Sequence, residues 1–149
     1  EMSGGSAANT MCGIASFGGR AAYIGKVAQD ALGDTFSKDM QVVGVDFKRP
    51  VGGNSVPTGR CIIAVTPDAQ RTMNTFLGIS SLLTPADLDH GAIAAGAVLY
   101  LEGYLYDQPE AKVAFRAAAD GGAGAGVHVP ANCHLAAQGH RLVSPGVTR

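Results

Sequence analysis

The fold is decided by residues 4–33, which read GGSAANTMCGIASFGGRAAYIGKVAQDALG. Small residues closed by a diglycine predict a helix over Ser6–Phe17, because glycine commonly follows the end of a helix. Tyrosine and β-branched residues then predict a strand over Ala21–Val27. A second helix is predicted over Asp30–Val43, with an acid in its first turn. Its apolar stripe is formed by Leu32, Phe36, Met40 and Val43.

Outward from this stretch, strands and helices continue to alternate, which favours an α/β fold with a parallel sheet covered by helices. A Pro-Asp turn at 67–70 predicts a hairpin inserted between them. The strands expected are Val45–Arg49, Gly59–Thr66, Arg71–Leu77 and the continuously apolar Ala97–Leu101. The helices expected are one that begins at Thr84-Pro85 and one over Pro109–Ala119, whose apolar face is Ala111, Phe115 and Ala118.

Composition narrows the class of protein. The chain has 149 residues, 46% of them hydrophobic, which suits one domain with a real core. A formal net charge of −1 gives no basic surplus for binding nucleic acid. The longest apolar stretch, residues 92–101, is too short to cross a membrane, and no secretory signal is present, so no membrane partner is expected. Three widely spaced cysteines favour reduced thiols in a cytoplasmic protein.

The segment Gly4-Gly5-Ser6-Ala7-Ala8-Asn9 carries the clearest chemistry. Two glycines allow the backbone to approach a ligand closely, and the helix that follows presents free N–H groups at its positive end. Asn9, one turn later, can donate to and accept from a ligand hydroxyl. The alternative is an ordinary helix that follows a flexible segment.

The same residues, with their neighbours, resemble the ribokinase-like (PfkB) family of sugar and nucleoside kinases. The similarity runs through Gly18-Gly19, residues 23–33, Pro57-Thr58-Gly59, residues 70–73 and Tyr100-Leu101-Glu102-Gly103. It covers about residues 3–119, and its details are most similar to bacterial adenosine-kinase-like members. The resemblance implies a partial ribokinase-like (Rossmann-like) parallel sheet with flanking helices and a small inserted β lid.

The resemblance also implies a site. Gly4, Gly5 and Asn9 match the family positions that hold sugar hydroxyls, and Glu102 matches an acid that faces the substrate at a strand end. The strand pieces from Val45 to Leu77 match the lid. For Glu102 the alternative is a capping or solvated acid, and Lys26 and Arg71 are expected on a solvated face.

Departures from the family pattern limit what is expected of this chain. The family's first strand, with a sugar-binding Asp, is expected before residue 1. Its Gly-Ala-Gly-Asp anion hole, catalytic base and nucleotide site are expected beyond the similar segment. We therefore expect no catalytic residue in this chain. ATP and Mg²⁺ are expected as cofactors of the parent family, and we expect this chain to bind neither of them.

The sequence thus predicts a fragment of an ATP-dependent kinase that phosphorylates an alcohol group of a sugar or nucleoside. A non-catalytic remnant or ligand-binding protein is the alternative, and a dinucleotide-binding oxidoreductase domain is a weaker third hypothesis. The partner expected is a small sugar or nucleoside, with self-association through an exposed sheet edge or the lid as a further expectation.

Three motifs are interpreted as coincidental. Gly121–Gly126 lacks the last glycine of a dinucleotide loop, and Gly19–Lys26 lacks the first glycine and the Ser/Thr of a P-loop. The spacing of His128, Cys133, His134 and His140 fits no standard zinc site, so no metal is expected. Residues 120–149 are predicted to be a poorly ordered tail, and we hypothesise that they are read in a shifted frame, because they are rich in Gly and Ala without an apolar period.

Overall fold

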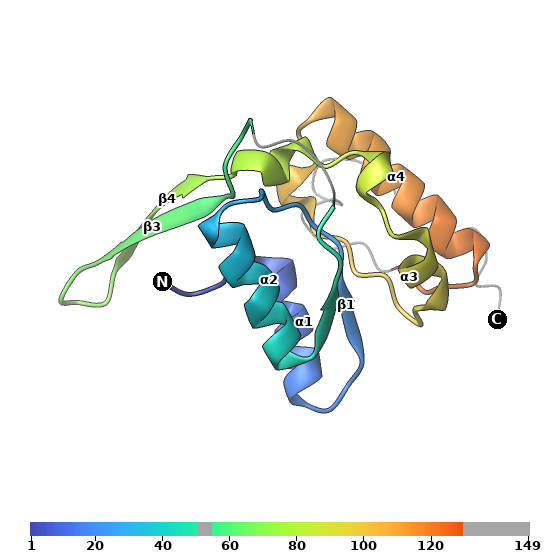
Figure 1. Ribbon diagram of the computed structural model, residues 1–149, viewed down its shortest axis with the longest axis horizontal. Coiled ribbons are helices and arrows are strands. Elements are labelled where there is room, and N and C mark those ends of the chain that lie inside the picture. Colours follow the sequence, from blue (N-terminus) through green and yellow to red (C-terminus); the bar gives the residue numbers. More distant parts are fainter. Residues whose placement is uncertain (51–54, 130–149) are drawn as a thin grey trace.

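A short parallel strand pair organises the first part of the molecule in the computed structural model, which describes residues 1–50 and 55–129. Strand β1 (Ala21–Tyr23) pairs with β2 (Val45–Phe47), with Ala21 opposite Val45. Helices α1 (Ser6–Ser16) and α2 (Ala31–Val43) pack against these strands (Figure 1). The expected α/β fold with a parallel sheet and flanking helices is therefore confirmed, although both strands are shorter than predicted.

Helix α2 has clear signals at both ends. The Asp30 side chain accepts a hydrogen bond from the Gly33 N–H at 2.8 Å, which satisfies one of the free amides of the first turn. Gly44 ends the helix with φ 85°, a left-handed conformation that favours glycine. Between these ends, Phe36 and Met40 of the predicted stripe pack into the core, whereas Val43 is 42% exposed.

Aromatic rings fill the space between α2 and the strands. Tyr23, Phe36 and Phe47 lie with their ring centroids 5.4 to 5.7 Å apart, in tilted and edge-on arrangements. Such geometries are the favourable ones for aromatic pairs. The cluster fixes α2 over the strand pair. The buried residues of this first core are Ala8, Val27, Met40, Val45 and Phe47.

The predicted hairpin forms a separate antiparallel sheet. Strands β3 (Arg60–Val65) and β4 (Arg71–Phe76) pair with Arg60 opposite Phe76. Figure 1 shows this hairpin projecting away from the helices, and all residues of both strands are exposed. Strand β2, which falls within the predicted lid segment 45–77, belongs to the parallel pair, where Val45 and Phe47 are buried, and the projecting hairpin begins at Arg60. The extent of the lid stays a prediction.

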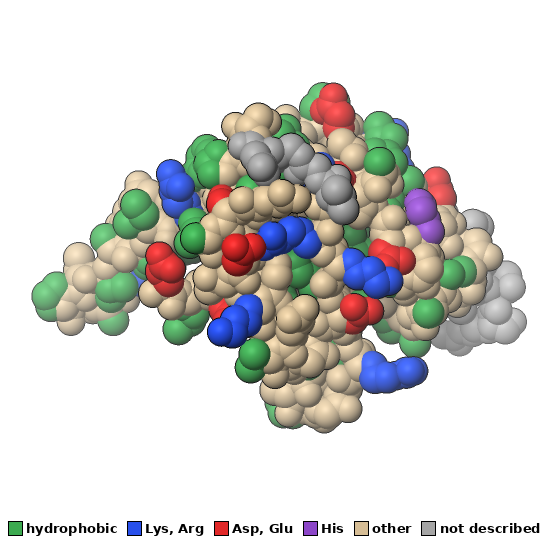
Figure 2. Space-filling model, in the orientation of Figure 1, with side chains coloured by type: hydrophobic (Ala, Val, Ile, Leu, Met, Phe, Trp, Pro, Cys, Tyr) green, Lys and Arg blue, Asp and Glu red, His purple; other side chains and the backbone are tan. Residues whose placement is uncertain are grey.

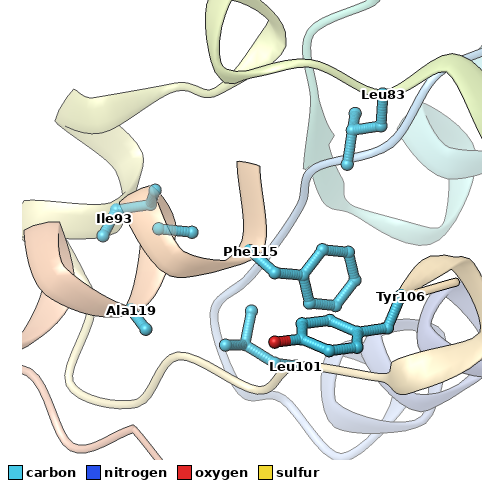
Figure 3. Close-up of a cluster of buried hydrophobic side chains, with 7 residues drawn as sticks. Leu83, Ile93, Leu101, Tyr106, Phe115 and Ala119 are labelled. Carbon is cyan, nitrogen blue, oxygen red and sulfur yellow. The ribbon is translucent and has the colours of Figure 1, made fainter. Parts of the chain in front are cut away.

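The second part of the molecule is held by α4 (Pro109–Gly124). The predicted apolar face, Ala111, Phe115 and Ala118, is buried, which confirms it. Phe115 lies edge-on to Tyr106, with ring centroids 5.9 Å apart (Figure 3). The remaining elements here are η1 (Gly78–Leu82), η2 (Pro85–Asp87), α3 (His90–Ala95) and η3 (Gly103–Leu105). The buried residues of this second core are Leu83, Ile93, Leu101, Tyr106, Phe115, Ala118 and Ala119.

Two segments differ from their predicted structure. The helix expected at Thr84 is a single 3-10 turn, and α3 begins at His90, where the Asp89 side chain accepts from the Ala92 N–H at 2.9 Å. In the segment expected as a buried strand, 97–101, Val98 forms a parallel bridge with His128 among the described residues, and Val98 is 58% exposed. Alternation of exposed and buried residues here is typical of a segment covered on one face only.

Helix α4 continues past its predicted end at Ala119. Gly122 is buried, and a Cβ there would lie 3.2 Å from Leu99 Cδ2, so this glycine permits close packing inside a helix. Gly126, with φ 78°, follows the helix, and the Val127 N–H bonds back to the Gly122 carbonyl at 2.9 Å. This is the pattern of a glycine-closed helix end. Regular structure therefore does not stop at 119, and the shifted-frame hypothesis for the later residues stays a prediction, with 130–149 outside the described residues.

Candidate functional site

The first turn of α1 has the open geometry that the diglycine predicts. Gly5 is the N-cap residue, with φ 108°, a conformation that residues with a side chain rarely adopt. Its carbonyl accepts the Asn9 N–H at 2.8 Å, the first hydrogen bond of the helix. A Cβ on Gly4 would meet nothing within 4 Å. Among residues 1–50 and 55–129 no side chain caps this end of the helix, so a side-chain cap does not satisfy its first N–H groups there.

Glu102, which is 96 residues after Ser6 in the sequence, lies at this end of α1. It directly follows the 97–101 segment, and its Oε1 accepts a hydrogen bond from Ser6 Oγ at 2.8 Å. Ser6 is the first residue of α1, so the contact places the predicted acid beside the predicted diglycine. Ser6 was absent from the predicted site. The signal that could have found it is a hydroxyl at the first helical position directly after Gly4-Gly5.

Tyr23, the last residue of β1, interacts electrostatically with Glu102. Burial raises the pKa of its hydroxyl, and the negative charge of Glu102 raises the pKa further. A Cβ on Gly25 would lie 2.5 Å from Tyr23 Oη, so a glycine there makes room for the ring. The hydroxyl therefore stays protonated at neutral pH and can donate a hydrogen bond. Sequence reasoning placed Tyr23 only in a strand.

Asn9 is not drawn into this group. Its side chain is exposed on α1, and among the described contacts it makes no side-chain hydrogen bond to Glu102 or Ser6. The structure thus brings Gly4 and Gly5 together with Glu102, and leaves Asn9 one turn away. A carboxylate, two hydroxyls and a helix N-terminus can together recognise a ligand with several hydroxyls.

Two lysines near the strand ends are paired with aspartates. Lys26, expected on a solvated face, is instead largely buried and lies 2.7 Å from Asp87. Lys48 lies 2.7 Å from Asp89, beside a shallow hollow that does not include Glu102. In residues 1–50 and 55–129 no three His, Cys, Asp or Glu side chains are grouped to hold a metal ion. Cys133, His134 and His140 lie outside these ranges.

The family model described as pfkB family carbohydrate kinase matches residues 1–141. No curated protein matches the chain. Within the described part, no helix has the length and apolar character needed to cross a membrane.

Two solved structures share high identity with the chain. The adenosine kinase from Sinorhizobium meliloti is 47% identical with a TM-score of 0.80, over 87% of this chain and 40% of that chain. A probable sugar kinase from Rhizobium etli CFN 42 is 43% identical with a TM-score of 0.80, over 86% of this chain and 39% of that one. A fructokinase from Xylella fastidiosa, at 16% identity and a TM-score of 0.77, shares the fold. The chain spans about 40% of the length of the first two structures.

Proposed function

The chain belongs to the pfkB family of carbohydrate kinases, and from that membership we propose that it forms the acceptor-binding part, with a lid, of an ATP-dependent sugar or nucleoside kinase. Among possible acceptors, the 47% identity to the Sinorhizobium meliloti protein favours a specificity like that of adenosine kinases. The acceptor would offer an alcohol group for phosphorylation and further hydroxyls for recognition.

The observation that carries this proposal is the hydrogen bond from Ser6 to Glu102. It joins the diglycine helix start to the end of the 97–101 segment. In our proposal, the Glu102 carboxylate accepts from acceptor hydroxyls, and the Tyr23 hydroxyl and the first amides of α1 donate to them. A site built from paired hydrogen bonds discriminates strongly against analogues that lack the hydroxyl, because its polar groups would then be left unpaired.

The hairpin β3–β4 supplies the lid in this proposal. Its strands expose several apolar side chains, among them Ile62, Val65 and Met73, and Figure 2 shows hydrophobic side chains on the projecting hairpin. Closure over a bound acceptor would cover such side chains and exclude water from the reacting groups. Self-association through the same hairpin would also cover them, and we keep it as a second use of this surface.

ATP and Mg²⁺ belong to the reaction of the parent family. The described part of this chain offers no cluster of metal ligands, and three of its cationic side chains, Lys26, Lys48 and Arg49, are held by aspartates. These groups do not fit a nucleotide–metal site, and the proposed function assigns them no contact with ATP or the metal. The role proposed for this chain is to bind and orient the acceptor.

A ligand-binding role without phosphoryl transfer is the second candidate. The observation that favours it is that the groups joined by the Ser6–Glu102 hydrogen bond suit an acceptor, whereas Gly-Ala-Gly-Asp, the family's anion hole and base, is not among these 149 residues, which span about 40% of the relatives' length. Without a base and preorganised donors for the transferring group, the chemical step lacks its main sources of acceleration. We therefore expect the purified chain to bind an acceptor and to phosphorylate none.

Titration calorimetry with adenosine, ribose and fructose tests acceptor binding. We expect one of them to bind, and Glu102→Gln to weaken that binding about tenfold or more, because a charged acceptor is lost. Glu110→Gln, an exposed acid in the first turn of α4, is the matched control and should bind as the parent does. Equal affinity of Glu102→Gln and the parent, or no binding of any acceptor, contradicts the proposal.

Incubation with ATP and Mg²⁺ then separates the two candidates. Binding of the acceptor without formation of a phosphorylated product supports the ligand-binding role for this chain. ATP-dependent phosphorylation by the pure chain would show that catalysis does not need the missing motif.

A further inference from the structure

The hairpin is attached to the rest of the molecule through a narrow neck. The Ile79 N–H donates to the Pro57 carbonyl at 2.9 Å, which draws its two legs together. A Cβ on Gly59 would lie 2.6 Å from the Leu77 carbonyl oxygen, and one on Gly78 would lie 2.3 Å from that of Pro57. Because residues 60–76 are all exposed, the orientation of the hairpin is set at this neck.

Thr58 anchors the incoming leg. It is 6% exposed, and its hydroxyl donates to Asp30 Oδ1 at 2.6 Å and accepts from the Ala28 N–H at 2.9 Å. Its own N–H donates to Asp30 Oδ2 at 2.8 Å. Asp30 also accepts from Gly33, so a single carboxylate joins the neck to the start of α2. Buried hydrogen bonds to a charged group are among the stronger ones in a protein.

A separate set of contacts anchors the outgoing leg. Lys26 Nζ lies 2.7 Å from Asp87 Oδ2 and donates to the Leu82 carbonyl at 3.2 Å. The same Asp87 oxygen accepts from the Thr84 N–H at 2.8 Å and from its hydroxyl at 2.9 Å. The side chains of Lys26 and Asp87 are 13% and 9% exposed, so this anchor is shielded from water.

Both anchors originate from one loop, residues 24–30, which directly follows β1. We propose that this loop is the seat of the lid: it fixes the orientation of the hairpin, and Thr58, held by Asp30, is the principal positioning residue. The loop begins directly after Tyr23, the last residue of β1. The inference rests on the proposed function only in naming the hairpin a lid.

Pulsed electron paramagnetic resonance on the full chain tests the seat without any ligand. Cys61 is exposed in β3 and supplies a native labelling position on the hairpin. Lys38→Cys, at an exposed position of α2, supplies the second label, in a background with Cys12→Ala and Cys133→Ala. The distance distribution between the two labels then reports how firmly the hairpin is held.

Thr58→Val removes the hydroxyl and keeps the shape of the side chain. We expect the population with a displaced hairpin to rise about tenfold, because the buried Ala28 N–H loses its acceptor and Asp30 Oδ1 loses one of its two donors. Thr58→Ser restores the hydroxyl and should restore the parent distribution. Thr72→Val, an exposed threonine within β4, is the matched control and should leave the distribution unchanged.

A Thr58→Val distribution as narrow as that of the parent, in a chain folded by circular dichroism, overturns the proposal. If Thr58→Val does not fold, Asp30→Asn replaces it in the same measurement. Asp30→Asn keeps one acceptor oxygen and should broaden the distribution in the same direction, and a parent-like width for it also overturns the proposal. Acceptor binding is measured in a separate experiment. The proposal about the loop can therefore be contradicted while the proposed function is supported, and the proposed function can be contradicted while the proposal about the loop is supported.

Discussion

The two strand pairs of the molecule are stabilised in opposite ways. β1 and β2 contribute only three residues each, yet Val45 and Phe47 are buried and the aromatic cluster with Phe36 locks them in place. β3 and β4 contribute six residues each and bury none of them. The short pair depends on side-chain packing, and the long pair depends on its own ladder and turn. An isolated hairpin is marginal in water, so β3–β4 depends on its seat and on whatever covers it.

The largest contrast is expected between two phenylalanines. Phe47→Ala removes a ring from the buried cluster and should lower the free energy of unfolding by about 3–5 kcal/mol. Phe76→Ala, in β4, removes a 45% exposed ring whose main contact is Arg60, and should cost about 1 kcal/mol or less. Urea unfolding followed by circular dichroism measures both. Equal losses of unfolding free energy in the two variants would mean that Phe76 is packed as firmly as Phe47, which would contradict the contrast between the two strand pairs.

The next effect concerns the neck that joins the two regions. Gly78 has φ 55°, and a Cβ there would meet the Pro57 carbonyl, so Gly78→Ala combines backbone strain with a clash. We expect a loss of about 2–4 kcal/mol. Gly44→Ala is the control, because its φ of 85° is also left-handed but a Cβ would meet nothing within 4 Å, and it should cost about 1 kcal/mol. Similar thermal melts for the two variants would contradict the close approach at the neck.

Low pH should weaken the two anchors of the hairpin, which depend on the carboxylates of Asp30 and Asp87. Burial acts to raise the pKa of Asp30, but hydrogen bonds from Thr58 and Gly33 outweigh it, and the net pKa lies below its usual value. Burial also acts to raise the pKa of Asp87, but the hydrogen bonds from Lys26 and Thr84 and the positive charge of Lys26 outweigh it, and the net pKa is lowered. A carboxylate with a depressed pKa stabilises the fold above its unfolded pKa, and this contribution is lost as the pH falls through the folded pKa.

The urea midpoint should therefore fall as the pH decreases below about 4. The slope of that fall should be smaller in Asp30→Asn, since one of the titrating groups is gone. Asp107→Asn, at an exposed position, should keep the parent slope. If Asp30→Asn leaves the slope of the urea midpoint against pH unchanged, Asp30 does not contribute to the loss of stability in acid.

The smallest effect is expected at the hairpin turn. Ala69 has φ 64°, which is unfavourable for a residue with a Cβ, so Ala69→Gly should stabilise the turn by about 0.5 kcal/mol. Hydrogen exchange of residues 60–76 should slow slightly while exchange in α2 stays unchanged. Ala64→Gly, inside β3, should act in the opposite direction. Faster exchange in Ala69→Gly would show that the turn is not strained.

Much of the fold could be predicted from local patterns. Asp30 with the Phe36–Met40 stripe predicts α2, and the Pro-Asp turn predicts the hairpin, because caps and turns act over a few residues. Gly122 misled the prediction for α4: its role is to let Leu99 approach, and that contact is visible only in three dimensions. The 97–101 segment was predicted as a buried strand because its apolar run is typical of one, but burial depends on neighbours that a single segment does not reveal.

The candidate site was predictable in part. The diglycine is predicted from its own chemistry and Glu102 through a family resemblance, and the structure places Gly5 and Glu102 near each other through Ser6. Ser6 and Tyr23 were missed because a helical serine and a strand tyrosine have many ordinary roles. The anchors of the hairpin, Asp30 with Thr58 and Lys26 with Asp87, join residues far apart in the sequence, and no local pattern indicates them.

The closeness of Gly59 and Leu77 has a consequence for how such a chain can vary. A segment whose two ends meet can be replaced, lengthened or removed without changing the path of the chain on either side, since its closure needs only a short link. The β3–β4 hairpin is therefore an exchangeable module whose two ends meet at one place. Hairpins from other members of the family could be grafted onto residues 58 and 78 of this chain to change what the hairpin covers, while the two buried cores keep their sequence.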